Sequence, residues 1–87
     1  MLIMEEKISK QPFWSEEVKL KVWEKGILIK NYDASKWRMD KFGLLMNYDH
    51  YENINSSTSW KIGFTTSLKN GGLKKLNNLI PKNTRSR

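Results

Sequence analysis

The chain has 87 residues, with 16 Lys and Arg against nine Asp and Glu, and a formal net charge of +7. This length suits one small domain whose core burial alone leaves it only modestly stable. Cysteine is absent, which excludes a disulfide framework and a thiolate zinc site. The four Trp, three Tyr and three Phe are therefore expected to supply much of the core.

The chain begins with an apolar run, Met1-Leu2-Ile3-Met4, which Glu5 and Glu6 follow at once. That run is far too short for the core of a signal peptide or for a membrane span. We expect residues 1–14 to form a tail that packs in part through Ile3 and Ile8. The default expectation is a cytoplasmic protein without a membrane partner.

A helix is predicted over residues 15–25. Ser15 suits the N-cap, and Glu16 and Glu17 lie in the first turn, where the helix dipole favours negative charge. Trp14, Val18 and Val22 recur at four-residue spacing and form an apolar stripe for core packing. Gly26 is the C-terminal stop.

The middle of the chain is mixed. Tyr32 to Ser35 suits a turn, and Ser35 is placed to cap a single helical turn that carries Trp37 and Arg38. Residues 42–48 and 60–66 contain strand-forming residues, and the polar segment between them has loop composition. These features predict an antiparallel hairpin over residues 42–66.

Residues 67–87 are predicted to form a basic loop and a short helix. Asn70-Gly71-Gly72 indicates a turn, and Pro81 suits the first position of a helix because its missing N–H costs nothing there. The fold class expected from these elements is α+β, as one small domain over residues 1–87. No spacing in the chain indicates a metal site or a cofactor site.

The charge is distributed unevenly. Residues 1–59 hold equal numbers of basic and acidic side chains, and residues 60–87 contain no acid. The whole net charge therefore lies in the last third, on Lys61, Lys69, Lys74, Lys75, Lys82, Arg85 and Arg87. Such a surface attracts a phosphate backbone through counterion release. The alternative is a solvated basic surface that only aids solubility.

Residues 59–81 carry a recognisable pattern, Ser-Trp-Lys-Ile-Gly-Phe-Thr-Thr-Ser-Leu-Lys-Asn-Gly-Gly-Leu-Lys-Lys-Leu-Asn-Asn-Leu-Ile-Pro. It resembles the core of bacterial HNH endonucleases, which runs Gly-Trp-x-Ile-Asp-His-Ile, a loop with Gly-Gly, then Leu-Ser-Asn-Leu-x-Pro. Upstream, the stretches 22–26, 32–33, 37–40 and 51–53 match further family positions in the same order. The resemblance covers about residues 16–83.

Three departures from the family pattern bear on function. Gly63 and Phe64 stand where the family has the Asp-His pair that supplies a metal ligand and the general base. Glu52 replaces a turn glycine, and the chain ends at Arg87, where the family continues through a helix that carries its last His or Asn. Neither glycine nor phenylalanine binds a metal or moves a proton. The resemblance thus implies a scaffold that does not cut.

The family pattern also implies structural roles. Asn78 matches the central asparagine, whose side chain bridges backbone groups of the loop, and Gly71 and Gly72 match the glycine pair. Trp60 is expected in the core with Trp37. Phe64 is expected to fill the former catalytic position or to point outward as a contact for a partner protein.

The sequence offers only weak candidates for other catalytic or metal-binding residues. His50, the only histidine, lies beside Asp49 but about fourteen residues before the position where the family needs a histidine, so it is expected to be an ordinary loop side chain. Asp40, Asp49 and Glu52 do not follow the spacing of a known cation loop and are expected to be surface acids. An enzyme alternative would need a rewired metal site of His50, Asp49 and Asn83.

The function expected is therefore that of a catalytically inactive binding protein and not of an enzyme. Its partners would be nucleic acid, RNA or DNA, or a guide RNA–effector complex that it inhibits as a phage anti-CRISPR protein does. Alternatives are the rewired nuclease and a non-inhibitory DNA-binding accessory factor. A monomer or a weak homodimer is expected.

Overall fold

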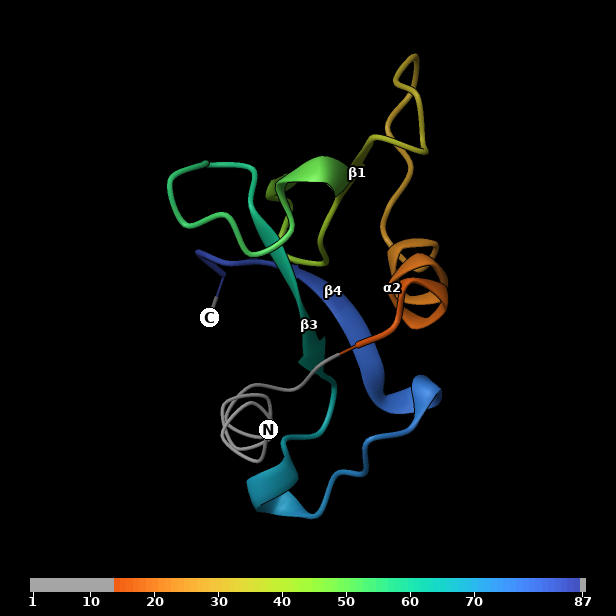
Figure 1. The fold of residues 1–87 in the computed structure, drawn as a ribbon, viewed down its shortest axis with the longest axis vertical. Coiled ribbons are helices and arrows are strands. Elements are labelled where there is room, and N and C mark those ends of the chain that lie inside the picture. Colours follow the sequence, from red (N-terminus) through yellow and green to blue (C-terminus); the bar gives the residue numbers. More distant parts are fainter. Residues whose placement is uncertain (1–13, 87) are drawn as a thin grey trace, which may run out of the picture.

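The computed structural model describes residues 14–86, which form one α-helix and two antiparallel β-hairpins (Figure 1). In chain order the helix and strands are α2 (Glu16–Trp23), β1 (Trp37–Met39), β2 (Leu45–Asn47), β3 (Trp60–Phe64) and β4 (Leu79–Asn83). Short 3-10 turns lie between them: η1 (Tyr48–His50), η2 (Leu68–Asn70) and η3 (Leu76–Asn78). The predicted α+β class is confirmed. The expected packing of Ile3 and Ile8 falls outside the described residues.

Helix α2 begins at the predicted N-cap but ends at Trp23, with Glu24 as its C-cap, two residues before the predicted end. The Ser15 hydroxyl accepts a hydrogen bond from the Val18 N–H at 3.2 Å, which satisfies one of the free donors of the first turn. The helix buries Val22 and Trp23 and lies beside β4 (Figure 1). The predicted range of residues 15–25 therefore contains the observed helix and its caps.

The predicted pairing of the strands is wrong. Residues 45–47 pair with β1, with Trp37 opposite Asn47, so β1 also replaces the expected helical turn at Trp37 and Arg38. β3 pairs instead with β4, with Trp60 opposite Asn83 and Phe64 opposite Leu79. β1 and β2 are joined by a short turn, so their loop closure costs little entropy. No hairpin over residues 42–66 forms because both of its expected strands take other partners.

The predicted helix after Pro81 is also wrong, because Pro81 lies in the middle of β4. The Asn83 N–H, two residues on, points away from β3 and donates to the Asp40 carboxylate at 2.9 Å. Backbone groups alternate in direction along a strand, so the Pro81 nitrogen also points away from β3, and its missing N–H costs no bond between the strands.

Aromatic side chains form the centre of the core. The Trp23 and Trp60 rings lie 4.9 Å apart between centroids, and Tyr51 meets Trp60 edge-on at the same distance. Both indole N–H groups donate to backbone carbonyls, from Trp23 to Ala34 and from Trp60 to Tyr48. Aliphatic residues complete this core: Val22, Met46, Ile62 and Leu79. The prediction that Trp60 lies in the core is confirmed, whereas Trp37 is only partly buried and lies against Tyr32, outside this core.

Asp40 is a buried carboxylate, only 1% exposed, and not the surface acid expected. One oxygen accepts hydrogen bonds from the N–H groups of Phe42 and Leu44, each at 3.0 Å. The other accepts from the Asn83 N–H and the Ser86 hydroxyl. Burial alone raises the pKa of Asp40, but the bonds from Ser86 and three backbone N–H groups outweigh it, so the pKa lies below its ordinary value.

Replacing Asp40 with Asn should lower the free energy of unfolding at neutral pH by about 2 kcal/mol, because a charged acceptor is lost and an amide N–H faces other donors. The pKa of Asp40 is lower in the folded state, so its carboxylate stabilises the fold above the unfolded pKa of about 3.9. This contribution is lost as the pH falls through the folded pKa. The difference in the free energy of unfolding between the natural sequence and the variant should therefore become smaller below about pH 4, as measured by denaturant titrations.

Asp49→Asn is the matched control, since Asp49 is exposed and pairs with Lys36 at the surface. Its cost should stay below about 1 kcal/mol. Equal losses in both variants would contradict a special role for Asp40.

Candidate nucleic-acid interface

The two faces of the β3–β4 hairpin differ in chemistry. Alternate residues of both strands face the core: Trp60, Ile62, Phe64, Leu79, Pro81 and Asn83. On the other face, Lys61 lies directly opposite Lys82, and Gly63 lies opposite Ile80. Two like charges opposite each other across strands are unfavourable, and an anion between them relieves the repulsion. We call this side of the hairpin the outer face.

Gly63 and Phe64, at the positions of the family's Asp-His pair, have packing roles. A Cβ atom at Gly63 would lie 3.1 Å from Lys82 Cδ, so the stem of Lys82 runs across Gly63. Phe64 is partly buried, with its ring centroid 6.5 Å from that of Trp14. Glycine at 63 therefore lets a lysine cover the outer face, and Phe64 fills space toward Trp14.

Asn78 holds the loop that joins β3 to β4. Its Oδ1 accepts from the Thr66 N–H at 2.8 Å, and its Nδ2 donates to the carbonyls of Thr66 and Leu73, each at 2.9 Å. Gly71 adopts a φ of +93°, and a Cβ at Gly72 would fall 1.8 Å from the Thr66 carbonyl oxygen. These contacts explain why two glycines and an asparagine stand at these positions.

This loop presents Lys69, Lys74 and Lys75, all of them exposed. Its base is tied to the segment that follows helix α2, because the Lys25 ammonium donates to the carbonyls of Leu76 and Leu79. The three lysines thus extend from a loop that is held at both ends. We call them the loop lysines.

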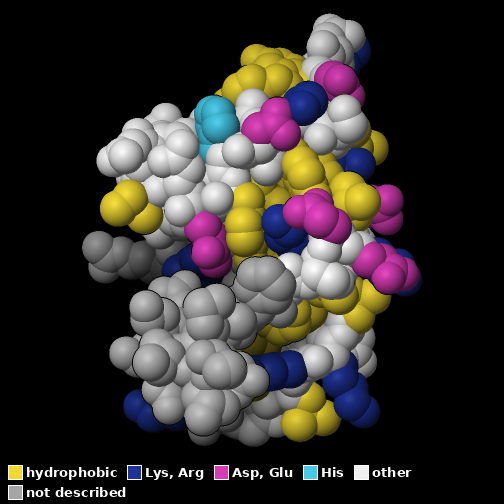
Figure 2. All heavy atoms as spheres, viewed as in Figure 1, with side chains coloured by type: hydrophobic (Ala, Val, Ile, Leu, Met, Phe, Trp, Pro, Cys, Tyr) yellow, Lys and Arg dark blue, Asp and Glu magenta, His cyan; other side chains and the backbone are white. Residues whose placement is uncertain are grey.

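The structure separates the predicted basic residues into groups. The loop lysines lie at one end of the hairpin, Lys61 and Lys82 lie on its outer face, and Arg85 follows the far end of β4. Five paired residues make a strand about 14 Å long. Arg87 lies outside the described residues. In Figure 2 the acidic side chains of the described residues lie in the upper and middle parts of the visible face, whereas basic side chains also occur low on that face.

The sequence did not point to Lys41 and Phe42, which the structure brings to Lys82. Phe42 is 52% exposed, and the ammonium groups of Lys41 and Lys82 lie 5.3 and 5.9 Å from the centroid of its ring. Phe42 was assigned to a strand, yet it lies in the turn between β1 and β2. The available signal was the order Lys41-Phe42-Gly43, which places an aromatic ring between a base and a turn glycine.

The residues of a rewired metal site have other partners. The His50 ring nitrogen lies 2.8 Å from the Thr58 hydroxyl, and Asp49 pairs with Lys36. The Asn83 amide nitrogen donates to the carbonyls of Leu45 and Ser57. Within residues 14–86, no group of three His, Asp or Glu side chains is placed to hold a metal ion.

Glu52 adopts a φ of +52°, in the left-handed region that favours glycine. This is the position at which the resembled pattern has a turn glycine.

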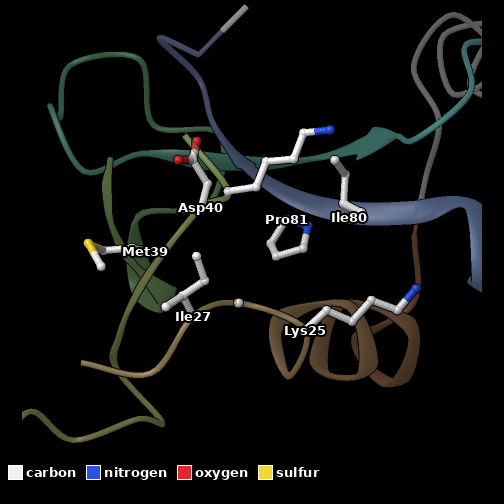
Figure 3. A pocket seen from close by; sticks show the side chains of 8 residues that line it. Lys25, Ile27, Met39, Asp40, Ile80 and Pro81 are labelled. Carbon is white, nitrogen blue, oxygen red and sulfur yellow. The ribbon is translucent and has the colours of Figure 1, made fainter. Parts of the chain in front are cut away.

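A small pocket lies between the end of α2 and β4 (Figure 3). Lys25 and Ile27 line one side, Met39 and Asp40 a second, and Ile80 and Pro81 a third. Its volume of about 60 Å³ is far below the several hundred Å³ that a small-molecule site needs. A larger, open hollow of about 450 Å³ is lined by Glu52, Ile54, Lys61 and Thr84.

No protein-family model, no curated protein and no solved structure matches this chain. The likeness to HNH endonucleases therefore stands on the residues quoted above. In the part of the chain that the structure describes, no helix is both long enough and apolar enough to cross a membrane.

Replacing Asn78 with Ala should loosen the β3–β4 loop, because three hydrogen bonds to its backbone disappear. We expect faster amide exchange at Thr66 and faster cleavage after the loop lysines by a lysine-specific protease. The stability loss should be about 1 kcal/mol. The neighbouring exposed Asn77→Ala is the control and should change neither rate; similar rates for both variants would contradict the bridging role.

Proposed function

We propose that this chain is a catalytically inactive, HNH-like protein that binds nucleic acid, either free or within a guide RNA–effector complex. The observation that carries the proposal is which residues occupy three positions of the β3–β4 hairpin and its loop. Gly63 and Phe64 stand where the family's metal ligand and base would be, while Asn78 still bridges the loop backbone. The scaffold features are kept and the chemistry is lost.

Electrostatics supports the binding half of the proposal. Residues 60–87 contain no acid, so no carboxylate of their own competes with a phosphate. Within residues 14–86, the three ion pairs all involve lysines that precede this region. Lys61 and the loop lysines are exposed and can release counterions from a phosphate backbone.

The more specific form of the proposal is inhibition of a guide RNA–effector complex, as by a phage anti-CRISPR protein. A small basic protein that docks on nucleic acid without cutting it can occupy a site that an effector needs. A non-inhibitory accessory factor would use the same surface. Adding purified protein to a guide-directed cleavage assay separates the two roles, because only an inhibitor slows target cleavage.

Reversing two loop charges, Lys74→Glu with Lys75→Glu, should weaken nucleic-acid binding on the order of a hundredfold or more at low salt, because two contacts become two repulsions. The slope of log affinity against log salt should also become shallower. Fluorescence anisotropy at several salt concentrations measures both. Folding should hardly change, since exposed charges contribute little to stability.

The matched control reverses Lys21 and Lys30, two exposed lysines outside the acid-free region. Both double variants lower the net charge by the same amount. A binding site on the basic third requires that the control bind far more tightly than Lys74→Glu with Lys75→Glu. Equal affinities would show that only net charge matters.

The purified protein should cleave neither DNA nor RNA with magnesium, manganese, nickel or zinc. Changing Gly63→Asp together with Phe64→His should restore measurable metal affinity by calorimetry, because the carboxylate that serves the family as a metal ligand returns to the outer face at position 63. The flexible end of Lys82 has to move aside, which is a small change.

Gly63→Ala with Phe64→Leu is the control for altered packing and should bind no metal. Absence of metal binding by the Asp-His variant, with its fold intact by circular dichroism, would contradict the assignment of positions 63 and 64. Metal-dependent cleavage by the natural sequence that disappears in His50→Ala would revive the nuclease alternative.

A further inference from the structure

The Phe42 ring is unusually exposed for an aromatic side chain in so small a protein. The residue is 52% exposed, although other aromatic side chains pack in or against the core. Tyr32 shows the same exposure, but its ring meets Trp37 edge-on. The Phe42 ring instead has the ammonium groups of Lys41 and Lys82 beside it.

The backbone holds this ring in a fixed place. The buried Asp40 carboxylate accepts the N–H groups of Phe42 and Leu44, and Gly43 turns the chain with a φ of +86°. The same carboxylate is bound to Asn83, one residue after Lys82. A ring whose backbone is fixed loses little conformational entropy on binding.

The charges around the ring are suited to a phosphate chain. The ammonium groups of Lys41, from the turn between β1 and β2, and of Lys82, from β4, lie near the ring. Lys61 is paired with Lys82 across the hairpin. The acid nearest in sequence, Asp40, is buried and bound by four hydrogen-bond donors, which offset part of its negative charge at this surface. The exposed Glu52 lines a hollow with Lys61, on the side of the site away from the ring. The ring can stack on a flat π-system while the ammonium groups turn to the adjoining phosphates.

We infer that Phe42, Lys41, Lys61 and Lys82 form a stacking site for single-stranded nucleic acid, in which Phe42 takes one base and the lysines hold neighbouring phosphates. This inference rests on the proposed function and names the strand form and the anchoring residue. Bases of a duplex are already stacked on each other and cannot cover an outside ring, whereas single strands offer free base faces. The site therefore favours single strands over duplexes.

The test compares three labelled probes: single-stranded polyuridine, an abasic strand that has the same sugar–phosphate backbone but no bases, and a duplex. Each is roughly twelve nucleotides long, within the site sizes of small single-strand binders. Phe42→Ala should weaken polyuridine binding roughly fivefold to a hundredfold, because base–aromatic stacking is lost. Its salt slope should not change, since no phosphate contact is lost. Binding of the abasic strand should hardly change.

Phe42→Leu keeps an apolar side chain and should behave like Phe42→Ala, whereas Phe42→Trp should retain affinity. Lys82→Gln should make the slope of log affinity against log salt shallower by roughly 0.7, because one phosphate contact on a single strand is lost. Tyr32→Ala removes an equally exposed ring and is the control, with affinity expected to stay unchanged. Polyuridine carrying 5-iodouracil should crosslink to Phe42, as located by mass spectrometry.

The outcomes separate the two proposals. If the natural sequence binds none of the probes, the proposed function fails for free nucleic acid, and the stacking site fails with it. If the natural sequence binds with a clear salt slope but Phe42→Ala binds equally well, only the stacking site is overturned. The stacking site would also be overturned if Phe42→Ala lost as much affinity for the abasic strand as for polyuridine. It would likewise be overturned if Phe42 were needed only for binding to an acidic protein.

Discussion

The buried carboxylate of Asp40 is the constraint on which the arrangement of the two hairpins depends. It closes the turn between β1 and β2 through Phe42 and Leu44 and binds the end of β4 through Asn83 and Ser86. An unpaired buried charge is costly, whereas one that accepts several hydrogen bonds is stable, so both segments must stay in place together. Segments more than forty residues apart are thereby fixed at one point, although each hairpin alone would be only marginally stable in water.

The same network determines which parts of the hairpin remain available. Along the outer edge of β4, the Leu79 carbonyl binds Lys25, Pro81 has no N–H, and the Asn83 N–H binds Asp40. A second chain therefore does not find a run of free backbone groups along this edge, which is one way in which natural sheets avoid edge-to-edge association. A partner at this edge of β4 therefore has to contact side chains and not backbone groups. The outer face of the hairpin, which is a separate surface, offers the side chains of Lys61 and Lys82.

Local signals in the sequence were sufficient for local structure. Ser15 and the glutamates after it mark the start of the helix, and the burial of Trp60 follows from its size. Strand partners were not predictable in this way, because the short segments 42–48, 60–66 and 79–83 have no length or alternation that favours one pairing over another. The burial of Asp40 depends on Asn83 and Ser86, far away in the chain. Phe42 was misassigned for the same reason: only the closed turn shows that its ring faces solvent beside Lys82.

On the proposed function, the two replacements at the family's catalytic positions have one physical logic. A nuclease of this type needs an acid and a metal between itself and the phosphate, and the metal offsets the charge of the acid. With Gly63 there is no acid on the outer face, and no side chain blocks Lys82 from lying across the hairpin. Phe64 occupies space beside Trp14 that a polar side chain would fill poorly. Under that proposal, lysines would meet the phosphate backbone without a metal, and the absence of catalysis and the metal-free binding surface would both follow from these two positions.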